Sequence, residues 1–214
     1  MKRIISLFAV LVLLSSFNLA AQNFFDMDDL DEESKVFVSF GPSIGMTASS
    51  LSSSLGAFED FGTRVGFTAS AFVNIRFFNR DIRSKAETGL LAFQPELRFA
   101  TLGGNGSESK LGLGYMTIPL MLQVYPLEQL YLEIGPTMCL NISHTPNSIV
   151  TSNSGYNLDN LHANDVAFAF GVGYKFNNIG IGARYYIGLS NIASNMLWKN
   201  RWLEMGLSYS FSLK

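Results

Sequence analysis

The chain has 214 residues, of which 48% are hydrophobic, 13% aromatic and only 15% charged, whereas soluble domains usually carry about 25% charged residues. The 18 phenylalanines exclude a disordered chain, and the single cysteine, Cys139, excludes a disulfide scaffold. Beyond the N-terminus, no apolar run approaches the roughly 18 residues that a membrane-spanning helix needs. These counts favour one folded domain with a surface that is poor in charge.

Residues 1–21 have the three parts of a secretory signal peptide. Lys2 and Arg3 form a positively charged start, residues 4–14 are apolar apart from one serine, and small residues follow as far as Ala21. We expect cleavage after Ala21, with Ala20 as the alternative. A single membrane anchor is the alternative, but the apolar stretch is short for that role.

Residues 22–35 are predicted to be an acidic periplasmic linker. This segment contains six acids, namely Asp26, Asp28, Asp29, Asp31, Glu32 and Glu33. Their mutual repulsion favours a solvated, flexible segment. A calcium loop would need a glycine at its sixth position and a glutamate at its twelfth, and neither is present. Leaving out these acids, 13 basic and 11 acidic residues remain after position 21, so no basic patch for nucleic acid is expected.

Residues 36–214 contain eight segments in which apolar and polar or small residues alternate with period two, the pattern of β-strands. The predicted strands are Val36–Ala48, Arg64–Phe77, Thr88–Phe99, Tyr115–Tyr125, Leu130–Ile142, Asp165–Phe176, Ile179–Ser190 and Trp202–Phe211. Each is long enough to cross a membrane as a tilted strand, which takes about 9–11 residues. The even count is typical of bacterial outer-membrane barrels.

The predicted connections alternate between long and short. The long ones cover residues 49–60, 103–109, 144–163 and 191–200, and the short ones cover 79–84, 126–129 and 177–178. Asn177-Asn178 suits a two-residue hairpin because asparagine tolerates a positive φ. Outer-membrane barrels have short periplasmic turns and longer external loops. We therefore expect the long connections to lie outside the cell.

The two faces of the strands indicate which side meets lipid. One face is bulky and apolar, while the other carries small residues and both signs of charge. The charged side chains of this second face are Arg64, Arg76, Glu96, Arg98, Glu133, Asp165, Lys175, Arg184 and Glu204. Bulky side chains do not fit inside a narrow eight-stranded barrel, and a soluble barrel needs more outward charge. We therefore predict an all-β, eight-stranded, antiparallel, up-and-down transmembrane barrel with a side-chain-filled lumen.

The balance of five cations and four anions predicts a lumen charge network that closes the barrel, since buried charges are tolerated when they are paired. A selectivity ring would instead place one sign of charge at one height. Aromatic residues near the strand ends are candidates for interfacial girdles, namely Tyr125, Tyr131, Tyr174, Tyr185, Trp198, Trp202 and Tyr209. Tyr131 and Trp202 share the alternation of the lumen face, so packing inside the barrel is an equal alternative for them.

Catalytic and metal-binding patterns are weak. His144 and His162 fall in one predicted loop with nearby Asp and Ser residues, but no nucleophile motif accompanies them. Two histidines that far apart lack the spacing of a zinc motif. Cys139 points inward by alternation and cannot form an internal disulfide. The sequence therefore predicts no enzyme activity and no cofactor.

Five short motifs, in order, resemble the PorT-like family of small outer-membrane β-barrel proteins of Bacteroidota. They are Gln94-Pro95-Glu96-Leu97-Arg98-Phe99, Ile118-Pro119-Leu120, Ile134-Gly135-Pro136, Gly171-Val172-Gly173-Tyr174 and the stretch 183–192. The resemblance implies an outer-membrane barrel without known catalytic or cofactor residues, and the founding member is linked to protein secretion and gliding. One departure is the end of the chain, where Phe211 is followed by three further residues instead of being a terminal aromatic.

Together, these features predict signal-directed export to the outer membrane and contact with membrane lipid. The function expected first is a structural or interaction role in the cell envelope, with protein partners bound through the external loops and a link to secretion. The alternative is a channel that handles small solutes or lipids.

Overall fold

A computed structural model describes residues 36–53, 61–77, 91–105, 110–144, 164–190 and 198–212. The predicted signal peptide and acidic linker, residues 1–21 and 22–35, lie outside this described part. The described strands are β1 (Val36–Ser53), β2 (Phe61–Phe77), β3 (Leu91–Asn105), β4 (Lys110–Val124), β5 (Leu130–His144), β6 (Asn164–Phe176), β7 (Ile179–Gly188), β8 (Trp198–Tyr209) and β9 (Phe211–Ser212). A search of these residues finds no helix with the length and apolar character needed to cross a bilayer.

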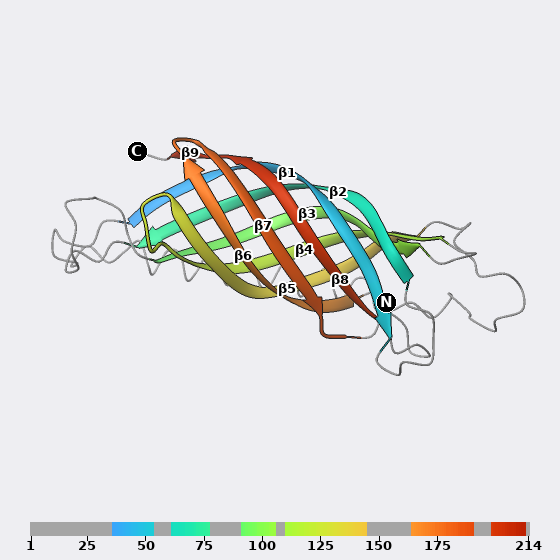
Figure 1. Ribbon diagram of the computed structural model, residues 1–214. Coiled ribbons are helices and arrows are strands. Elements are labelled where there is room, and N and C mark those ends of the chain that lie inside the picture. Colours follow the sequence, from blue (N-terminus) through green and yellow to red (C-terminus); the bar gives the residue numbers. More distant parts are fainter. Residues whose placement is uncertain are drawn as a thin grey trace, which may run out of the picture. The chain divides into compact units, whose positions relative to one another are not determined.

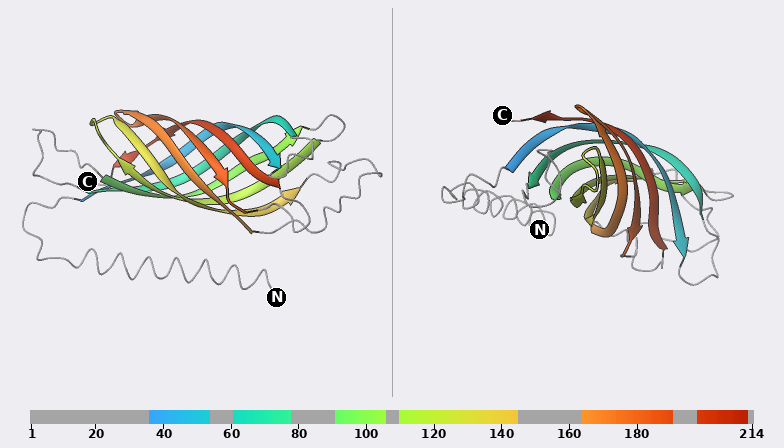
Figure 2. Two further views of the ribbon diagram at one scale, coloured as in Figure 1. Left: turned by 60° about the horizontal axis from the view of Figure 1, so that its bottom comes forward. Right: turned by 60° about the vertical axis from the view of Figure 1, so that its left-hand side comes forward.

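The strands form one closed, up-and-down antiparallel sheet (Figures 1 and 2). Each strand from β2 to β7 pairs with the next one in sequence, and β1 closes the ring by pairing with both β2 and β8. At the closing seam, Met46 on β1 lies opposite Met205 on β8. The short β9 continues β8 beyond Ser210 and places Phe211 opposite Phe40 of β1. The predicted eight-stranded barrel is therefore confirmed, with β8 and β9 acting as one interrupted strand.

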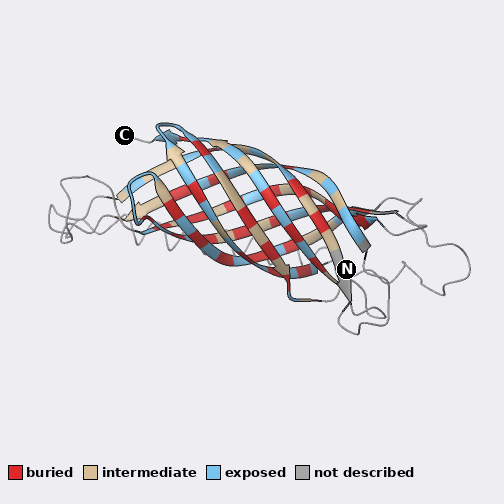
Figure 3. Cartoon of the chain, in the orientation of Figure 1, coloured by how far each residue is buried: buried red, intermediate tan, exposed pale blue. Residues whose placement is uncertain are grey.

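Burial alternates along the strands, as Figure 3 shows. On β6, the large apolar residues from Val166 to Phe176 are all exposed, while Asp165, Ala167 and Ala169 are buried. The same arrangement holds around the ring: apart from Phe37 near the start of β1 and Leu127 in a turn, the exposed large residues belong to the apolar face. The predicted orientation, with the apolar face outward, is thus confirmed. This arrangement is opposite to that of a soluble barrel, which hides its apolar side chains.

The tight turn between β6 and β7 is confirmed at Asn177-Asn178, where Asn177 has a φ of 51°. Asparagine accepts this left-handed conformation more readily than most residues. The turn also forms hydrogen bonds with Ser210, the residue between β8 and β9. The backbone N–H of Ser210 donates to the Asn178 carbonyl at 2.8 Å, and the Asn178 side-chain amide donates to the Ser210 carbonyl at 2.6 Å.

Several strand ends differ from the prediction. β1 continues to Ser53, β3 continues to Asn105, and β8 begins at Trp198, because backbone pairing persists through Ser, Gly and Lys residues that lack an apolar alternation. The predicted short turns at 126–129 and 177–178 are described, whereas the predicted turn at 79–84 lies outside the described residues.

Candidate functional site

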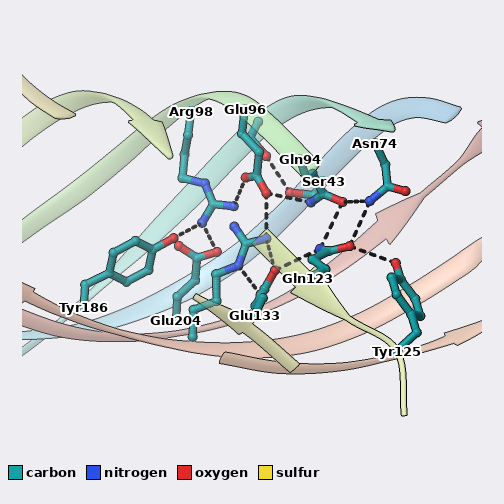
Figure 4. A network of polar contacts seen from close by, with 12 residues as sticks. Ser43, Asn74, Gln94, Glu96, Arg98, Gln123, Tyr125, Glu133, Tyr186 and Glu204 are labelled. Atoms are coloured by element: carbon teal, nitrogen blue, oxygen red, sulfur yellow. Dashed lines mark hydrogen bonds and ion pairs between the residues drawn. The ribbon is translucent and has the colours of Figure 1, made fainter. Parts of the chain in front are cut away.

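A cluster of buried ionic side chains lies inside the barrel (Figure 4). Glu96 of β3 accepts hydrogen bonds from the guanidinium groups of both Arg98 and Arg184. Arg184 Nη2 lies 2.6 Å from Glu96 Oε1, and Arg184 Nε lies 2.5 Å from Glu133 Oε1. Arg98 also forms an ion pair with Glu204 of β8. We call Glu96, Arg98, Glu133, Arg184 and Glu204 the ionic cluster; all five are buried and together they link β3, β5, β7 and β8.

Amide side chains extend this cluster toward the end of the barrel that carries the β6–β7 turn. Gln94 donates to Glu96 at 2.8 Å, and Gln123 donates to Glu133 at 3.0 Å. Asn74 of β2 donates to both glutamines, each at 2.8 Å, and the Tyr125 hydroxyl donates to Gln123. These bonds satisfy the carboxylates on the side away from the arginines, as buried polar groups require.

Two pairs of aromatic rings lie on either side of the ionic cluster. Toward the end with the 145–163 connection, Tyr186 and Trp202 are stacked with ring centroids 4.3 Å apart and planes within 7°. The Tyr186 hydroxyl also accepts a hydrogen bond from Arg98 Nη1 at 3.1 Å. Toward the other end, the centroids of Tyr125 and Tyr131 lie 5.5 Å apart. Both pairs are buried, so these residues are part of the lumen and not of an interfacial girdle.

Small residues make the space that these rings occupy. A Cβ atom on Gly173 would lie 2.1 Å from Cζ of Tyr131, which no side chain could accept without moving the ring. Phe72, which interrupts the polar face of β2 in sequence, is likewise buried in the lumen. The lumen thus matches the prediction that an eight-stranded barrel is just wide enough for its own side chains.

A cavity of about 40 Å³ remains beside the ionic cluster, and Arg98, Arg184 and Glu204 are among the residues that line it. Each of these three has one buried polar atom without a protein partner: Arg98 Nε, Arg184 Nη1 and Glu204 Oε2. A space of this size with polar walls suits water molecules, which bind where such atoms converge. It is far below the several hundred Å³ of an ordinary small-molecule pocket.

The structure joins five of the nine predicted lumen residues through ion pairs and places the other four elsewhere on the lumen face. The Arg76 guanidinium lies 3.7 Å from the Tyr125 ring centroid, and Lys175 Nζ lies 5.7 Å from the same centroid. Asp165 accepts hydrogen bonds from the Ser190 hydroxyl and the Val166 N–H. Arg64 lies opposite Ser49 in the β1–β2 register.

Sequence reasoning did not single out the amides of this site. Asn74, Gln94 and Gln123 occupy the same alternating positions as the charged residues, so their place on the lumen face was readable. Their role was not, because it depends on which strands bring them together. Of the predicted girdle residues, Tyr174 and Tyr209 are exposed on the outer face, in contrast to Tyr125, Tyr131 and Trp202.

The chemistry of the described residues offers no second centre. They contain no group of three or more His, Cys, Asp or Glu side chains that could hold a metal ion. Cys139 is a free, buried thiol, as its alternation predicts. The side chains of His144 and His162 lie outside the described part of the chain.

Several solved structures are similar to the chain at low sequence identity. The chain is similar to the crystal structure of Ail, the attachment invasion locus protein of Yersinia pestis, in complex with the heparin analogue sucrose octasulfate, at 13% identity and a TM-score of 0.48 over 81% of this chain and 99% of that chain. It is also similar to Neisserial surface protein A, at 15% identity and a TM-score of 0.49 over 80% and 97%. For the outer membrane protein OprG of Pseudomonas aeruginosa, the identity is 13% and the TM-score 0.30 over 82% and 95%.

A search of curated proteins found no significant match. Residues 21–194, most of the chain, match the family described as outer membrane protein beta-barrel domain. This match extends over all the strands from β1 to β7. The chain therefore belongs to the outer membrane protein beta-barrel domain family and is an outer-membrane barrel.

Proposed function

We propose that this protein is a sealed, non-enzymatic outer-membrane barrel that displays interaction surfaces in the cell envelope and does not conduct solutes. The observation that carries the proposal is the filled lumen, in which the ionic cluster lies between two pairs of aromatic rings. An ion that crosses this lumen would have to displace paired charges and then pass stacked rings without its hydration shell. Both steps are costly in a narrow space of low polarity.

The state of the lumen carboxylates supports a non-enzymatic role. Glu96 and Glu133 are nearly fully buried and are engaged by arginine and amide donors on more than one side. A general acid or base must reach a proton on a bound substrate. Carboxylates held in this way act as structural partners of the arginines.

The resemblance to PorT-like proteins gains support from the lumen. In the motif 94–99, Gln94, Glu96 and Arg98 point inward and all belong to the polar network, while Pro95 and Leu97 lie on the outer side. We propose that the chain is a PorT-like barrel, exported through residues 1–21, with residues 145–163 outside the cell. In this orientation, residues 22–35 lie in the periplasm. These two segments are the proposed contacts for envelope proteins, because binding usually resides on segments displayed by a rigid scaffold.

Conductance tests the seal. The full processed protein, purified from outer membranes and reconstituted in planar bilayers, should give no steady current above that of the bare bilayer. The reason is that the ionic cluster and the two pairs of aromatic rings lie in series across its lumen. Folding is checked in the same sample by heat-modifiable gel mobility. A steady conductance from the folded protein would contradict the seal and support the alternative, a small-solute or lipid-handling channel.

A change in the acidic segment tests the interaction role. Deleting residues 23–34 should lower the export of secreted proteins while the barrel still reaches the outer membrane. A variant of equal length, with the six acids changed to Asn or Gln, separates charge from length. The set of exported proteins is measured by mass spectrometry of the culture medium. If neither variant alters that set, the link to secretion is wrong.

A further inference from the structure

Two cations stand on the outer, lipid-facing side of β8. Along this strand Asn200 and Trp202 are buried in the lumen, so the alternating residues Lys199 and Arg201 point outward. They are the only charged side chains at outward positions in the strands whose side chains the structure describes. Within those residues, no ion pair or hydrogen bond of either side chain is found. The described part of the barrel therefore offers no partner for either charge.

The residues that follow on the same face of β8 are apolar. Leu203, Met205 and Leu207 are exposed, and Tyr209 is exposed at the far end of the strand. A strand rises about 3.3 Å per residue, so each outward step is roughly 7 Å. The outer face of β8 thus carries two cations at one end and a continuous apolar stripe along the rest of the strand. This order matches a single lipid, with its head group at Arg201 and its acyl chains along the stripe.

The neighbouring strands place the cations at the rim of the apolar belt. Arg201 lies opposite Ile187 of β7 on one side and Ser50 of β1 on the other. Leu203 is the next outward-facing residue of β8 toward the middle of the membrane. It lies opposite Ala48 of β1 and Tyr185 of β7. A cation on the lipid face is costly at the bilayer midplane and tolerated near the interface. At that depth the phosphates of lipid head groups supply counter-charges.

We propose that Lys199 and Arg201 bind the phosphate groups of a membrane lipid, with its acyl chains packed on the outer face of β8. Arginine is suited to this role because its planar guanidinium donates two parallel hydrogen bonds to phosphate oxygens. Lysine adds a second positive charge on the same face. The inference rests on the proposed orientation, which puts this end of β8 in the outer leaflet. The lipid class is therefore the phosphorylated glycolipid of that leaflet, lipid A.

Native mass spectrometry of the full processed protein in detergent, titrated with lipid A, tests this site. The wild-type protein should retain lipid A, and the variant with Lys199→Gln and Arg201→Gln should bind it roughly thirty-fold more weakly, because each surface cation strengthens the binding of an anionic lipid by about fivefold. The variant with Lys199→Arg and Arg201→Lys keeps both charges and should stay close to wild type. Heat-modifiable mobility verifies that each variant is folded.

The lipid is varied in the same experiment. Lipid A from which the phosphates have been removed should bind to the wild-type protein as weakly as intact lipid A binds to the glutamine variant. Equal binding of lipid A by both proteins would overturn the proposal. So would stronger retention of phosphatidylglycerol than of lipid A, or complete displacement by millimolar inorganic phosphate. Conductance is measured separately, so a barrel that conducts but retains lipid A contradicts the seal and leaves this lipid site standing.

Discussion

Replacing Arg184 with methionine should lower the free energy of unfolding by about 3–5 kcal/mol, the usual cost of removing one partner from a buried ion pair. Arg184 is the cation that bonds Glu133, and it shares Glu96 with Arg98. Without it, three buried carboxylates face a single arginine in the ionic cluster. Glu133 then keeps only the Gln123 amide as a hydrogen-bond donor among the contacts described above.

Glu96→Gln should cost much less, about 1–2 kcal/mol, although Glu96 touches both arginines. The ionic cluster has two arginines and three glutamates, so loss of this glutamate leaves two of each. Arg98 keeps Glu204, and Arg184 keeps Glu133. Ranked by the residues that each one bonds, Glu96 would come before Arg184, because it bonds Gln94 as well as both arginines. The balance of charge instead ranks Arg184 before Glu96.

Urea unfolding in lipid vesicles, followed by tryptophan fluorescence, measures both variants. Glu128→Gln is a suitable control, because Glu128 is exposed in the turn between β4 and β5 and its change should stay within about 0.5 kcal/mol. Equal losses for Arg184→Met and Glu96→Gln would show that local contacts, and not the balance of charge, determine the stability of the cluster.

The sequence was sufficient to predict the barrel and the inward direction of the charged residues, because both follow from period two. One residue in every two faces the lumen in any strand, whatever its neighbours are. Glu96, Arg98, Glu133, Arg184 and Glu204 could therefore be assigned to the lumen. The ion pairs among these residues could not be predicted, since Arg98 and Glu204 are 106 positions apart in the chain. Their meeting depends on the stagger between strands, which alternation does not encode.

The strand ends were harder to predict for a different reason. Alternation is visible only where one face is apolar, and β8 begins with Lys199 and Arg201 on its outer side. The backbone ladder with β1 continues through these residues although the sequence pattern has stopped. Lys199 was assigned to a loop and Arg201 fell between that loop and the predicted strand, so their position on the lipid face was missed. The signal that could have found them is that Lys199 and Arg201 occupy the same alternating positions as Leu203 and Met205.

Opening the lumen should require changes in two layers at once. The Tyr186–Trp202 stack lies one inward-facing step along β7 and β8 from Arg184 and Glu204, so an ion meets the stack and the ionic cluster in turn. The variant with Tyr186→Ser and Trp202→Ser should stay closed, because the ionic cluster remains. The variant with Arg98→Ser and Glu204→Ser removes one charge of each sign and should also stay closed behind the stack.

The combined fourfold variant should give a steady conductance in planar bilayers, where the wild-type protein and both twofold variants give none. Two barriers in series make the current depend on the higher one, so removal of either alone leaves the path blocked. Each large aromatic truncation costs about 3–5 kcal/mol, and heat-modifiable mobility must therefore show that the fourfold variant is folded. Conductance from one twofold variant would identify its layer as the whole seal. A folded fourfold variant that stays closed would place the seal at the lumen residues it leaves intact, the Arg184–Glu133 ion pair and the Tyr125–Tyr131 rings.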